Sequence, residues 1–532
     1  MHKIYSFLFL NLLILVAPAA SQELQIRKRL IDSTHPEQPR TVYKDERWAP
    51  AETAVIVCDM WDAHHCFNAV QRVNEMAPRM DAFLKKLRAQ GATIIHAPSS
   101  CVDFYKEHPA RANVKKVPRS TSIPKGIGQW CDHIPAELEY PLDQSDGGED
   151  DDPEAHQRWA KELQSRGRNP RAPWKRQVAS LKILDQDFVT DNGEEVWSIL
   201  DHRKIGNVML VGVHTNMCVL GRPFGLRQLA KNGKNVVLVR DLTDSMYNPA
   251  RWPFVDHYQG NRLIQRHIEK YVCGTITSNQ ILGGQEFRFK NDRPPKCVVV
   301  CAESLYGTEK TLKSFAERVI RDKLGFETRI LTSQKNEHKV DGLVEALSEA
   351  DLVVLSVRRR SLPQTQLAGL QAYLKKGKPL VAIRTSSHAF DTHDKHPEGH
   401  AEWPRFDIEV LGCDYTGHHA NGIRCQVSRA PASELNAKIH PILTDVKISA
   451  SEGSLYKSNP LGPRCTPLLM GKVENKPAEP IAWTNHYKKS KVFYTSLGSE
   501  TDFKNRGFRQ LLENGVRWAT NMKIGTEPSR KK

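Results

Sequence analysis

The chain has 532 residues, of which 39% are hydrophobic and 26% are charged, and its formal net charge is +16. This composition is typical of a soluble globular protein, and the length exceeds what one ordinary core holds, so we expect two domains. Lys and Arg are spread along the chain rather than gathered in a stripe, which argues against a nucleic-acid-binding protein. Beyond the N-terminus, no stretch is long and apolar enough to predict a membrane span.

The first 20 residues have the pattern of a secretory signal peptide. MHKIYSFLFLNLLILVAPAAS combines a short basic start, an apolar run and a small-residue cleavage pattern at Ala17, Pro18 and Ala19. We therefore expect an exported protein, either periplasmic or secreted. The 11 cysteines are odd in number and scattered, without a CxxC pair, so we expect mostly reduced, buried thiols.

Residues 21–50 are polar and poorly periodic, which is typical of a linker or an arm. From 51 to 285, buried strands alternate with amphipathic helices. This alternation predicts an α/β domain with a mostly parallel sheet and helices on both faces. The predicted strands are 53–60, 92–99, 207–213 and 235–241, and the predicted helices are 70–91, a helix ending near Gly233, and 259–271.

An irregular insertion, residues 100–178, interrupts this first domain. It contains the acidic run DQSDGGEDDDPEAH at 143–156. We interpret the run as a solvated surface loop. The alternative, a calcium site, lacks the alternating acidic ligands ending in Glu that calcium loops have.

A second α/β series covers residues 296–522, after a linker at 286–295. Its apolar runs alternate with helical patterns and predict a second mostly parallel sheet, flavodoxin-like in organisation, with helices on both faces. We expect the basic tail, 523–532, to be disordered.

Three side chains of the first domain supply the groups that thiol chemistry needs. Asp59 ends the first strand, at the carboxyl edge where doubly wound sheets place their active sites. Cys218 lies at a strand-to-helix junction, which favours a thiolate, and Lys182 precedes the strand that leads to it. Each also has an ordinary explanation: a capping Asp, a surface Lys and a core Cys.

The order of these motifs resembles the isochorismatase-like cysteine hydrolases. The segments are VIVCDMWD, a lone Lys182 with Phe188 six residues later, and LVGVHTNMCV, and the resemblance covers roughly residues 50–285. It implies a catalytic triad of Asp59, Lys182 and Cys218. Asp59 would take the thiol proton, Lys182 would support the thiolate, and Cys218 would attack an amide-type carbonyl to form a thioester.

The same resemblance implies a cis peptide bond at Val213–His214. The backbone amides of His214 and Cys218 would then form the oxyanion hole, which stabilises the charge that develops on the carbonyl oxygen.

The sequence also departs from this family. Nicotinamidases bind a metal through an Asp-x-His pair, whereas HAPSSCVDFYKEHPAR holds Asp103 and His108 without that pair, so we predict no metal and no cofactor. Trp61 stands where a Gln is common, and His64, His65 and Cys66 follow it. Trp61, His64 and His65 are candidates for substrate binding; the alternative is a helix start with polar caps. Trp130 and Cys131 lie in the insertion, which could act as a lid.

The second domain resembles the ThuA-like branch of the class I glutamine amidotransferases, linked by name to trehalose utilisation. The motifs are PLVAIRTSSHAF, EPIAWTNHYKKSKVFYTSLGS and FRQLLENGVRWA. Amidotransferases place a nucleophilic Cys on a sharp strand-to-helix turn, but the corresponding turn here, residues 384–387, has no Cys.

Histidines and acidic residues gather after this turn. They predict either a polar pocket for a sugar or a metal, or ordinary hydrogen-bonded loop histidines. The candidates for ligand binding are His388, His418 and His419. The other members of the cluster are His393, His396, His400, Asp391, Glu398 and Glu402.

Three functions are consistent with these patterns. The leading hypothesis is an exported amidohydrolase fused to a domain that binds or processes a carbohydrate-like compound, with a small amide as substrate. The second places the chemistry in the ThuA-like domain and makes the first a degenerate scaffold. The third is a non-catalytic binding protein of the envelope, for which the Asp–Lys–Cys set would be a coincidence. The resemblance leaves assembly into oligomers open.

Overall fold

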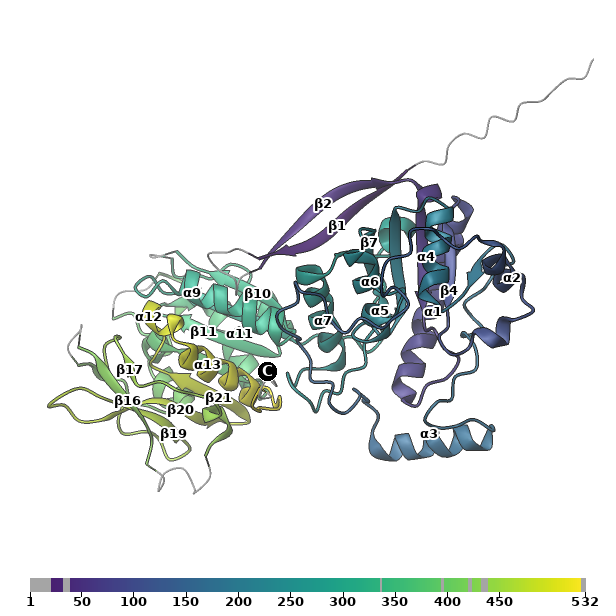
Figure 1. Ribbon diagram of the computed structural model, residues 1–532. Helices are drawn as coiled ribbons and strands as arrows, with labels where there is room; N and C mark the ends of the chain where they lie inside the picture. Colours follow the sequence, from purple (N-terminus) through teal and green to yellow (C-terminus); the bar gives the residue numbers. More distant parts are fainter. Residues whose placement is uncertain are drawn as a thin grey trace, which may run out of the picture. The chain divides into compact units, whose positions relative to one another are not determined.

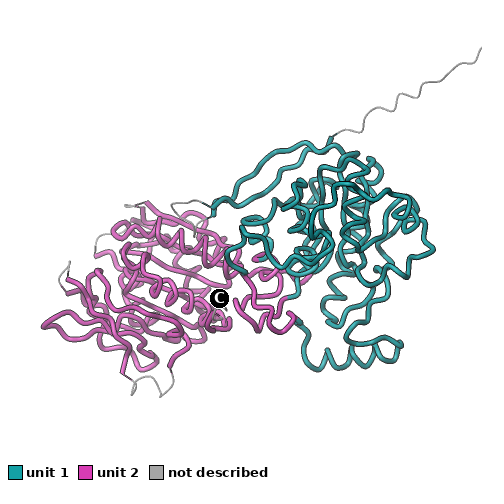
Figure 2. The backbone as a smooth tube through the Cα atoms, in the orientation of Figure 1, with its two compact units in different colours: residues 1–140, 149–246, 264–289 teal, residues 141–148, 247–263, 290–532 magenta. Residues whose placement is uncertain are grey.

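The computed structural model describes residues 21–31, 39–334, 337–393, 397–419, 423–431 and 439–527. The predicted signal peptide and the last five residues of the predicted tail lie outside the described residues. The chain divides into two compact units, which are described separately (Figure 2). Unit 1 comprises residues 1–140, 149–246 and 264–289, and unit 2 comprises 141–148, 247–263 and 290–532. The predicted domain boundaries stay a prediction.

Unit 1 is built on an eight-stranded sheet in the order β2-β1-β8-β7-β6-β3-β4-β5 (Figure 1). The strands from β8 to β5 in this order are parallel, as predicted. They are β3 (Thr53–Cys58), β4 (Thr93–Ala97), β5 (Phe188–Val189), β6 (Asn207–Val213), β7 (Asn235–Asp244) and β8 (Gly274–Ile276). All six residues of β3 are buried, which explains why its sequence is a continuous apolar run.

Residues 21–50 contain regular structure. They form β1 (Gln22–Leu30) and β2 (Arg40–Trp48), an antiparallel pair in which β1 also borders β8. Only Leu24 and Ile26 of β1 are fully buried, so the apolar signal is too short to stand out among the charges. The linker or arm predicted here therefore contains a two-stranded ribbon.

Helices flank the sheet of unit 1. The helix predicted at 70–91 is α1, and the one predicted at 259–271 is α7, whose first residues are counted with unit 2. The helices are α1 (Phe67–Ala89), α2 (Pro109–Lys116), α3 (Pro153–Ser165), α4 (Gly193–His202), α5 (Cys218–Gly221), α6 (Leu226–Lys231), α7 (His257–Tyr271) and α8 (Asn279–Leu282). The insertion predicted as irregular thus contains α2 and α3.

The acidic run in the insertion is not simply a solvated loop, and this corrects the prediction. Asp150 accepts two hydrogen bonds from the Arg72 guanidinium, at 2.8 and 3.0 Å, and Arg72 Nε donates to Asp244 at 2.7 Å. Asp151 accepts the backbone N–H groups of Phe67 and Asn68 at the start of α1. The run is partly buried because its carboxylates pair with an arginine and with helix amides.

Unit 2 is built on a nine-stranded sheet in the order β10-β9-β11-β13-β21-β20-β19-β16-β17. The first five strands in this order are parallel and the others pair antiparallel, so the predicted parallel sheet is extended by an antiparallel part. The strands are β9 (Lys296–Ala302), β10 (Glu327–Thr332), β11 (Leu352–Val357), β13 (Leu380–Ile383), β16 (Cys425–Arg429), β17 (Ala450–Ser451), β19 (Thr466–Lys472), β20 (Glu479–Tyr487) and β21 (Ser490–Thr495).

Hydrophobic clusters cover both faces of this sheet. Successive residues of β9, such as Val299 and Val300, belong to the clusters on opposite faces, because side chains alternate along a strand. The helices are α9 (Thr308–Phe315), α10 (Leu343–Glu349), α11 (Gln364–Lys375), α12 (Glu500–Lys504) and α13 (Arg506–Ala519), and the short helical segments include η3 (Ala316–Lys323) and η4 (Arg384–His388).

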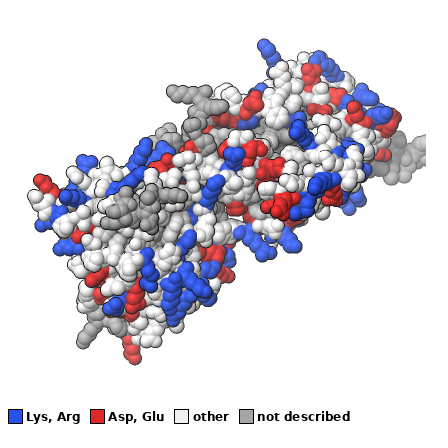
Figure 3. Space-filling model, turned by 90° about the horizontal axis from the view of Figure 1, so that it is seen from below, with Lys and Arg blue, Asp and Glu red and all other residues white. Residues whose placement is uncertain are grey.

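The distribution of surface charges and the state of the cysteines are as expected from the sequence. Basic and acidic side chains are interspersed on the face drawn in Figure 3. All 11 cysteines are free thiols, and all except Cys465 are buried. In the part of the chain that the structure describes, no helix combines the length and apolarity that a membrane span requires.

Candidate active site

Asp59 and Cys218 follow adjacent parallel strands of unit 1. The chain continues from β3 toward β4 and β5 on one side, and from β6 toward β7 and β8 on the other. The topological switch point of the sheet therefore lies between β3 and β6, where α/β folds form binding crevices. Asp59 immediately follows β3, and Cys218 begins α5 shortly after β6.

Gly212 allows the ends of these two strands to approach closely. It lies opposite Cys58 in the register, and its φ of 105° is in the region that favours glycine. A Cβ atom at this position would lie 2.0 Å from the Cys58 carbonyl oxygen. The glycine is therefore required for the spacing that brings Asp59 and the Cys218 loop together.

The Asp59 carboxylate is completely buried and accepts several hydrogen bonds. The backbone N–H of Ser99 donates to it at 2.8 Å and Nε of Arg222 at 3.2 Å, and the Cys218 thiol lies beside it. Asp59 itself has a φ of 47°, a strained conformation for a residue other than glycine, of a kind that gathers at functional sites.

Arg222 contacts both members of this pair. Its guanidinium also lies close enough to the Cys218 sulfur for the two charges to interact. Arg222 lies four residues beyond Cys218, at the C-cap of α5, so one helical turn places it beside the thiol. The Cys-x-x-x-Arg spacing was the sequence signal for this cation, and it was missed.

The charges around the thiol set its proton affinity. Burial raises the pKa of the Cys218 thiol, the Asp59 carboxylate raises it further, and Arg222 and the N–H of His214 lower it. Burial also raises the pKa of Asp59, against the opposing effect of Arg222. The arrangement is a protonated thiol beside a carboxylate whose basicity is enhanced by burial.

Lys182 is not brought to this pair. It is exposed, and its backbone N–H donates to Asp81 of α1 at 2.9 Å. Leu181 and Asp187 are the buried side chains of this segment, and Asp187 is held by Arg88, so Lys182 faces solvent. Within the described residues, the cation beside the thiol is Arg222, and not Lys182 as predicted.

The loop between β6 and α5 has the predicted backbone. The peptide bond Val213–His214 is cis, as the resemblance implied. The backbone N–H of His214 favours the ionised form of the Cys218 thiol, and the His214 carbonyl accepts the N–H groups of Met217 and Val219. The prediction that the backbone amides of His214 and Cys218 form the oxyanion hole stays a prediction. Of these two amides, the one that acts on the Cys218 sulfur is that of His214.

Aromatic side chains gather beside the loop. Trp61 stacks on Trp174 at 4.7 Å between ring centroids, His64 lies 4.0 Å from His65, and His64 meets His214 edge-on at 4.9 Å. The candidate substrate-binding residues Trp61, His64 and His65 are thus close together. Their binding role stays a prediction.

His64 also takes part in the start of a helix, which is the alternative role that the sequence left open. Its Nδ1 accepts the N–H of Cys66, the N-cap residue of α1, at 3.2 Å. Burial, followed by the charge of neighbouring His214, lowers the pKa of His64 well below its ordinary value, so the ring is neutral. His64 therefore belongs both to the start of the helix and to the aromatic group.

The insertion packs on α5. A Cβ on Gly221 would lie 2.5 Å from the Trp130 indole, and the Arg222 guanidinium lies 5.5 Å from the centre of the same ring. The N–H of Cys131 donates to the Gly221 carbonyl at 2.8 Å, and Glu137 makes a bidentate pair with Arg227. The segment predicted as a lid is thus anchored next to the nucleophile.

Two groups near the start of α1 have the chemistry of metal ligands. They are Cys66, Asp150 and Asp151, and Glu149, Asp151 and His156. Asp150 and Asp151 already bind Arg72 and the amides of α1. The prediction that no metal is bound stays a prediction. His108 lies in the segment where nicotinamidases bind their metal. Here it accepts the Ala110 N–H at the start of α2.

The candidate histidines of unit 2 have different surroundings. His388 stacks on Tyr415 at 4.5 Å, and His418 is exposed, with its ring 6.5 Å from that of Tyr456. His419 is buried and lies 3.4 Å from Glu479, whose carboxylate also accepts two backbone N–H groups. His419 thus has a structural partner, and His396 lies outside the described residues.

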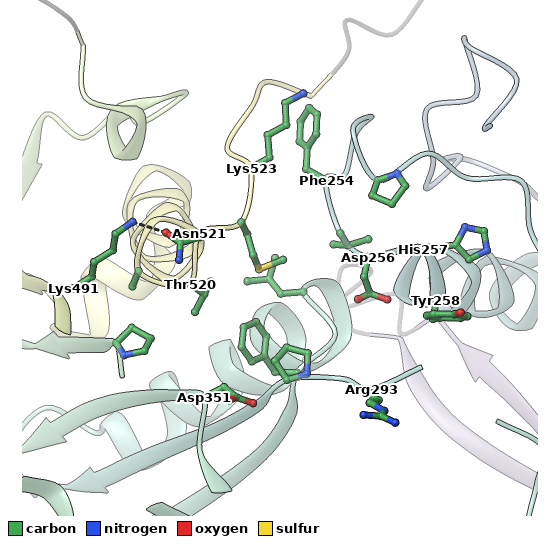
Figure 4. A pocket seen from close by; sticks show the side chains of 18 of the residues that line it. Phe254, Asp256, His257, Tyr258, Arg293, Asp351, Lys491, Thr520, Asn521 and Lys523 are labelled. Atoms are coloured by element: carbon green, nitrogen blue, oxygen red, sulfur yellow. Dashed lines mark hydrogen bonds between the residues drawn. The ribbon is translucent and has the colours of Figure 1, made fainter. Parts of the chain in front are cut away.

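A cavity of about 660 Å³ lies elsewhere in unit 2. Pro295, Asp351, Pro379 and Lys489, which line it, each precede one of the parallel strands. Figure 4 shows charged side chains around it, and Lys491 Nζ donates to the Asn521 side chain at 2.6 Å. Because α/β sheets bind ligands at the carboxyl ends of their strands, this cavity at the amino ends is not the candidate site.

Comparison with known proteins gives one family match. Residues 298–519 match the ThuA family model, described as trehalose utilisation, which confirms the resemblance of the second domain. No curated protein matches the chain.

Several solved structures are similar to parts of the chain. A ThuA-like protein from Bacteroides uniformis is 16% identical, with 44% of this chain and 95% of that chain covered and a TM-score of 0.33. A cysteine hydrolase from Pseudomonas syringae pv. phaseolicola is 15% identical, covering 44% and 92%, with a TM-score of 0.27. N-carbamoylsarcosine amidase from Thermoplasma acidophilum is 12% identical, covering 43% and 97%, with a TM-score of 0.24.

Proposed function

We propose that unit 1 is a cysteine hydrolase that cleaves a carbon–nitrogen bond of a small amide through a thioester on Cys218. The observation that carries this proposal is the position of the Cys218 thiol beside the buried Asp59 carboxylate, with Arg222 Nε 3.2 Å from Asp59 and its charge acting on the thiol. A nucleophile needs a base to take its proton and a cation to stabilise its anion, and this pair of neighbours supplies both.

Acylation uses each of these groups. Asp59 takes the thiol proton as the Cys218 sulfur attacks the carbonyl carbon, and Arg222 stabilises the developing thiolate. The carbonyl oxygen becomes an oxyanion that accepts the backbone N–H groups of His214 and Cys218. When the carbon–nitrogen bond breaks, Asp59 returns the proton to the leaving nitrogen, and the acyl group remains on sulfur.

Deacylation repeats the sequence with water. Asp59 takes a proton from the water as its oxygen attacks the thioester, and the carbon–sulfur bond then breaks. The acid leaves, and Asp59 returns the proton to Cys218. In this scheme Trp61, His64 and His65 contact the substrate, because His64 lies beside His214 and the other two rings lie next to His64.

We further propose that the chain is exported and that unit 2 binds a carbohydrate-like compound. The pattern of residues 1–20 supports export, and the family match at 298–519 supports the sugar-related role. Export is tested by expression in a secretion-competent bacterium, followed by the intact mass of the mature protein. A mass that still includes residues 1–20 would contradict it.

The hydrolase proposal is tested by labelling and by turnover. The full chain is treated with limiting iodoacetamide and digested, and mass spectrometry then quantifies labelling at each of the 11 cysteines. We expect Cys218 to be labelled first in the wild type, because Asp59 accepts the thiol proton as the sulfur is alkylated, and more slowly in Asp59→Asn, which has no such acceptor. A panel of small amides is then screened for release of amine, with Cys218→Ala as the inactive variant and Lys182→Ala as the matched control.

The outcomes separate the competing functions. Turnover that persists in Cys218→Ala would place the chemistry in unit 2 and make unit 1 a scaffold. Labelling of Cys218 no faster than that of the other thiols would remove the support for an activated nucleophile.

A further inference from the structure

Basic and aromatic side chains converge at the carboxyl ends of the parallel strands of unit 2. The chain continues from β9 to β10 on one side, and β11 lies on the other side, so the switch point lies between β9 and β11. Tyr306 follows β9, Arg358 and Arg359 follow β11, and Arg384 follows β13. This edge is where an α/β sheet binds its ligand.

Arg384 is a buried member of this group. It is 1% exposed, and its guanidinium donates to the Ser496 carbonyl at 2.7 Å and to the Ser454 hydroxyl at 3.1 Å. The guanidinium carbon lies 4.2 Å from the centre of the Tyr306 ring and 4.9 Å from that of Tyr456. Its buried Nε has no hydrogen-bond partner within the described residues.

Arg384 also occupies the sharp turn after β13. Its φ of 44° is strained for a residue with a side chain. At the turn where amidotransferases carry a nucleophilic Cys, this chain therefore has a fixed guanidinium. The geometry of the turn is present without a thiol, which suits binding rather than covalent catalysis.

Rings surround the buried arginine: those of His388 and Tyr415 are partly exposed, and that of Tyr456 is buried. His388 stacks on Tyr415 at 4.5 Å and lies 6.0 Å from Tyr456, and Tyr415 lies 5.0 Å from Tyr456. The N–H of Arg359 donates to the His388 carbonyl at 3.0 Å, which ties the loop after β11 to the turn after β13. The loops are thus fixed with their rings close together.

The three arginines at this edge form no direct ion pair within the described residues, although the charge of Asp502 acts on Arg384 from farther away. In the described part of the chain, no carboxylate lies within 4.0 Å of the guanidinium groups of Arg358, Arg359 and Arg384. Glu303, which follows β9, is occupied by the N–H groups of Leu305, Tyr306 and Thr308 and by the Thr308 hydroxyl. Three cations that remain close without a partner carboxylate favour an anionic ligand.

The histidine in the group is neutral. Burial lowers the pKa of His388 to about 3, and the neighbouring Arg359, Arg358 and Arg384 contribute to this change. Burial opposes ionisation of Tyr306, but Arg384 and hydrogen bonds outweigh it and lower the pKa of that phenol. The rings therefore supply polar contacts, and the arginines supply the charge.

We infer that this edge of unit 2 binds an anionic sugar derivative, a hydroxylated ring that bears a carboxylate or phosphate group, through Arg358, Arg359 and Arg384. The planar guanidinium groups match the oxygen geometry of either anion, and the Tyr and His rings match a flat hydroxylated body. The inference rests on the proposal that unit 2 binds a carbohydrate-like compound and adds the charge of that compound. It is independent of the hydrolase proposed in unit 1.

Isothermal titration calorimetry on the full chain tests this inference with three probes: glucuronate, glucose 6-phosphate and glucose. We expect at least one of the anionic sugars to bind, more weakly as salt is raised, and glucose to bind at least tenfold more weakly. Binding of glucuronate alone assigns a carboxylate ligand, and binding of glucose 6-phosphate alone assigns a phosphate ligand.

Variants locate the binding site. Arg358→Gln with Arg359→Gln should raise the Kd of the bound anion roughly 10–100-fold, because charge-assisted hydrogen bonds are lost. Arg405→Gln is the matched control, since this exposed arginine of the same unit pairs only loosely with Glu409 at 3.6 Å. Thermal unfolding of each variant verifies that the unit stays folded, and Arg384 is left intact because it is buried.

Three results would overturn the inference. Neither anionic sugar binds; glucose binds as tightly as the anions; or the Arg358/Arg359 variant binds like wild type. If glucose binds as tightly as the anionic sugars, unit 2 binds a carbohydrate but does not require its negative charge. Failure of the charge inference is thus distinguishable from failure of the carbohydrate proposal. Amide turnover by Cys218 is unaffected by any of these outcomes.

Discussion

Nε of Arg222 lies 3.2 Å from Oδ2 of Asp59, and the charge of the same guanidinium acts on the Cys218 thiol. One cation thus contacts both the base and the nucleophile of the proposed site. The side chain is partly exposed while the Asp59 carboxylate is completely buried, so Arg222 closes the solvent side of the pair.

This relationship predicts that Arg222, and not Lys182, supports catalysis. We expect Arg222→Gln to lower kcat/KM by about 10²–10³, the range for removal of one stabilising group from a preorganised site. Arg222→Lys should recover part of the loss, because it retains the charge. Lys182→Ala, which changes an exposed residue, should stay within about twofold of wild type. Steady-state kinetics on an identified amide measures all three, and equal losses in Lys182→Ala and Arg222→Gln would contradict the assignment.

The second prediction concerns the pH dependence of turnover. Asp59 must be ionised to take the thiol proton, and burial raises its pKa above the ordinary value of 3.8 despite Arg222. The rate should therefore fall as the pH drops through this raised pKa, so the acidic limb of kcat/KM should lie above pH 3.8. Asp59→Asn should remove activity at every pH. A profile with no acidic limb would show that Asp59 is not the base.

Stability should depend on Glu137 at acidic pH. Burial opposes its ionisation, but hydrogen bonds from His267 and Arg227 outweigh burial and lower its pKa from 4.5 to about 2. Since the folded pKa is the lower one, the stabilisation is present above pH 4.5 and is lost as the pH falls toward 2. Its size is about 3 kcal/mol.

Urea unfolding at pH 3 and at pH 6.5 measures this contribution. Glu137→Gln should reduce the difference in unfolding free energy between the two pH values, and Glu107→Gln, at an exposed position in the same insertion, should leave it unchanged. An unchanged difference in Glu137→Gln would show that the Glu137 pair does not stabilise the insertion.

Gly212 should tolerate no side chain. Gly212→Ala places a Cβ 2.0 Å from the Cys58 carbonyl and imposes a φ of 105° on an L-residue, so β3 and β6 must separate. We expect a loss of about 3 kcal/mol or more in unfolding free energy, together with loss of Cys218 labelling. Gly206→Ala is the matched control, because no atom lies within 4 Å of the added Cβ. Similar stabilities of the two variants, measured by urea unfolding, would contradict the close approach.

Much of the proposed site could be predicted from the sequence. β3 and β6 are continuous apolar runs, and parallel strands end at a common edge. Asp59 follows β3 directly, and Cys218 follows β6 after a short loop. Local sequence therefore suffices to place both residues at the same edge. The cis bond at Val213–His214 was also anticipated, through the resemblance of the surrounding motif.

The environment of Lys182 could not be predicted in the same way. Its segment has little regular structure before β5, and its direction is set by distant partners such as Arg88 and His96, which hold Asp187. The acidic run was misjudged for the same reason, because its partner Arg72 is 78 residues away from Asp150.

The sequence by itself determined the α/β character of both units, the edge that carries Asp59 and Cys218, and the missing Cys at the turn that begins at Arg384. Hydrophobic periodicity and strand ends are local properties, so they can be read along the chain. Only the tertiary structure decided that Arg222 is the cation beside the thiol, and that Arg358, Arg359 and Arg384 meet at one edge without a carboxylate. Charge pairing depends on distances between side chains from separate strands and loops, and those distances exist only once the chain has folded.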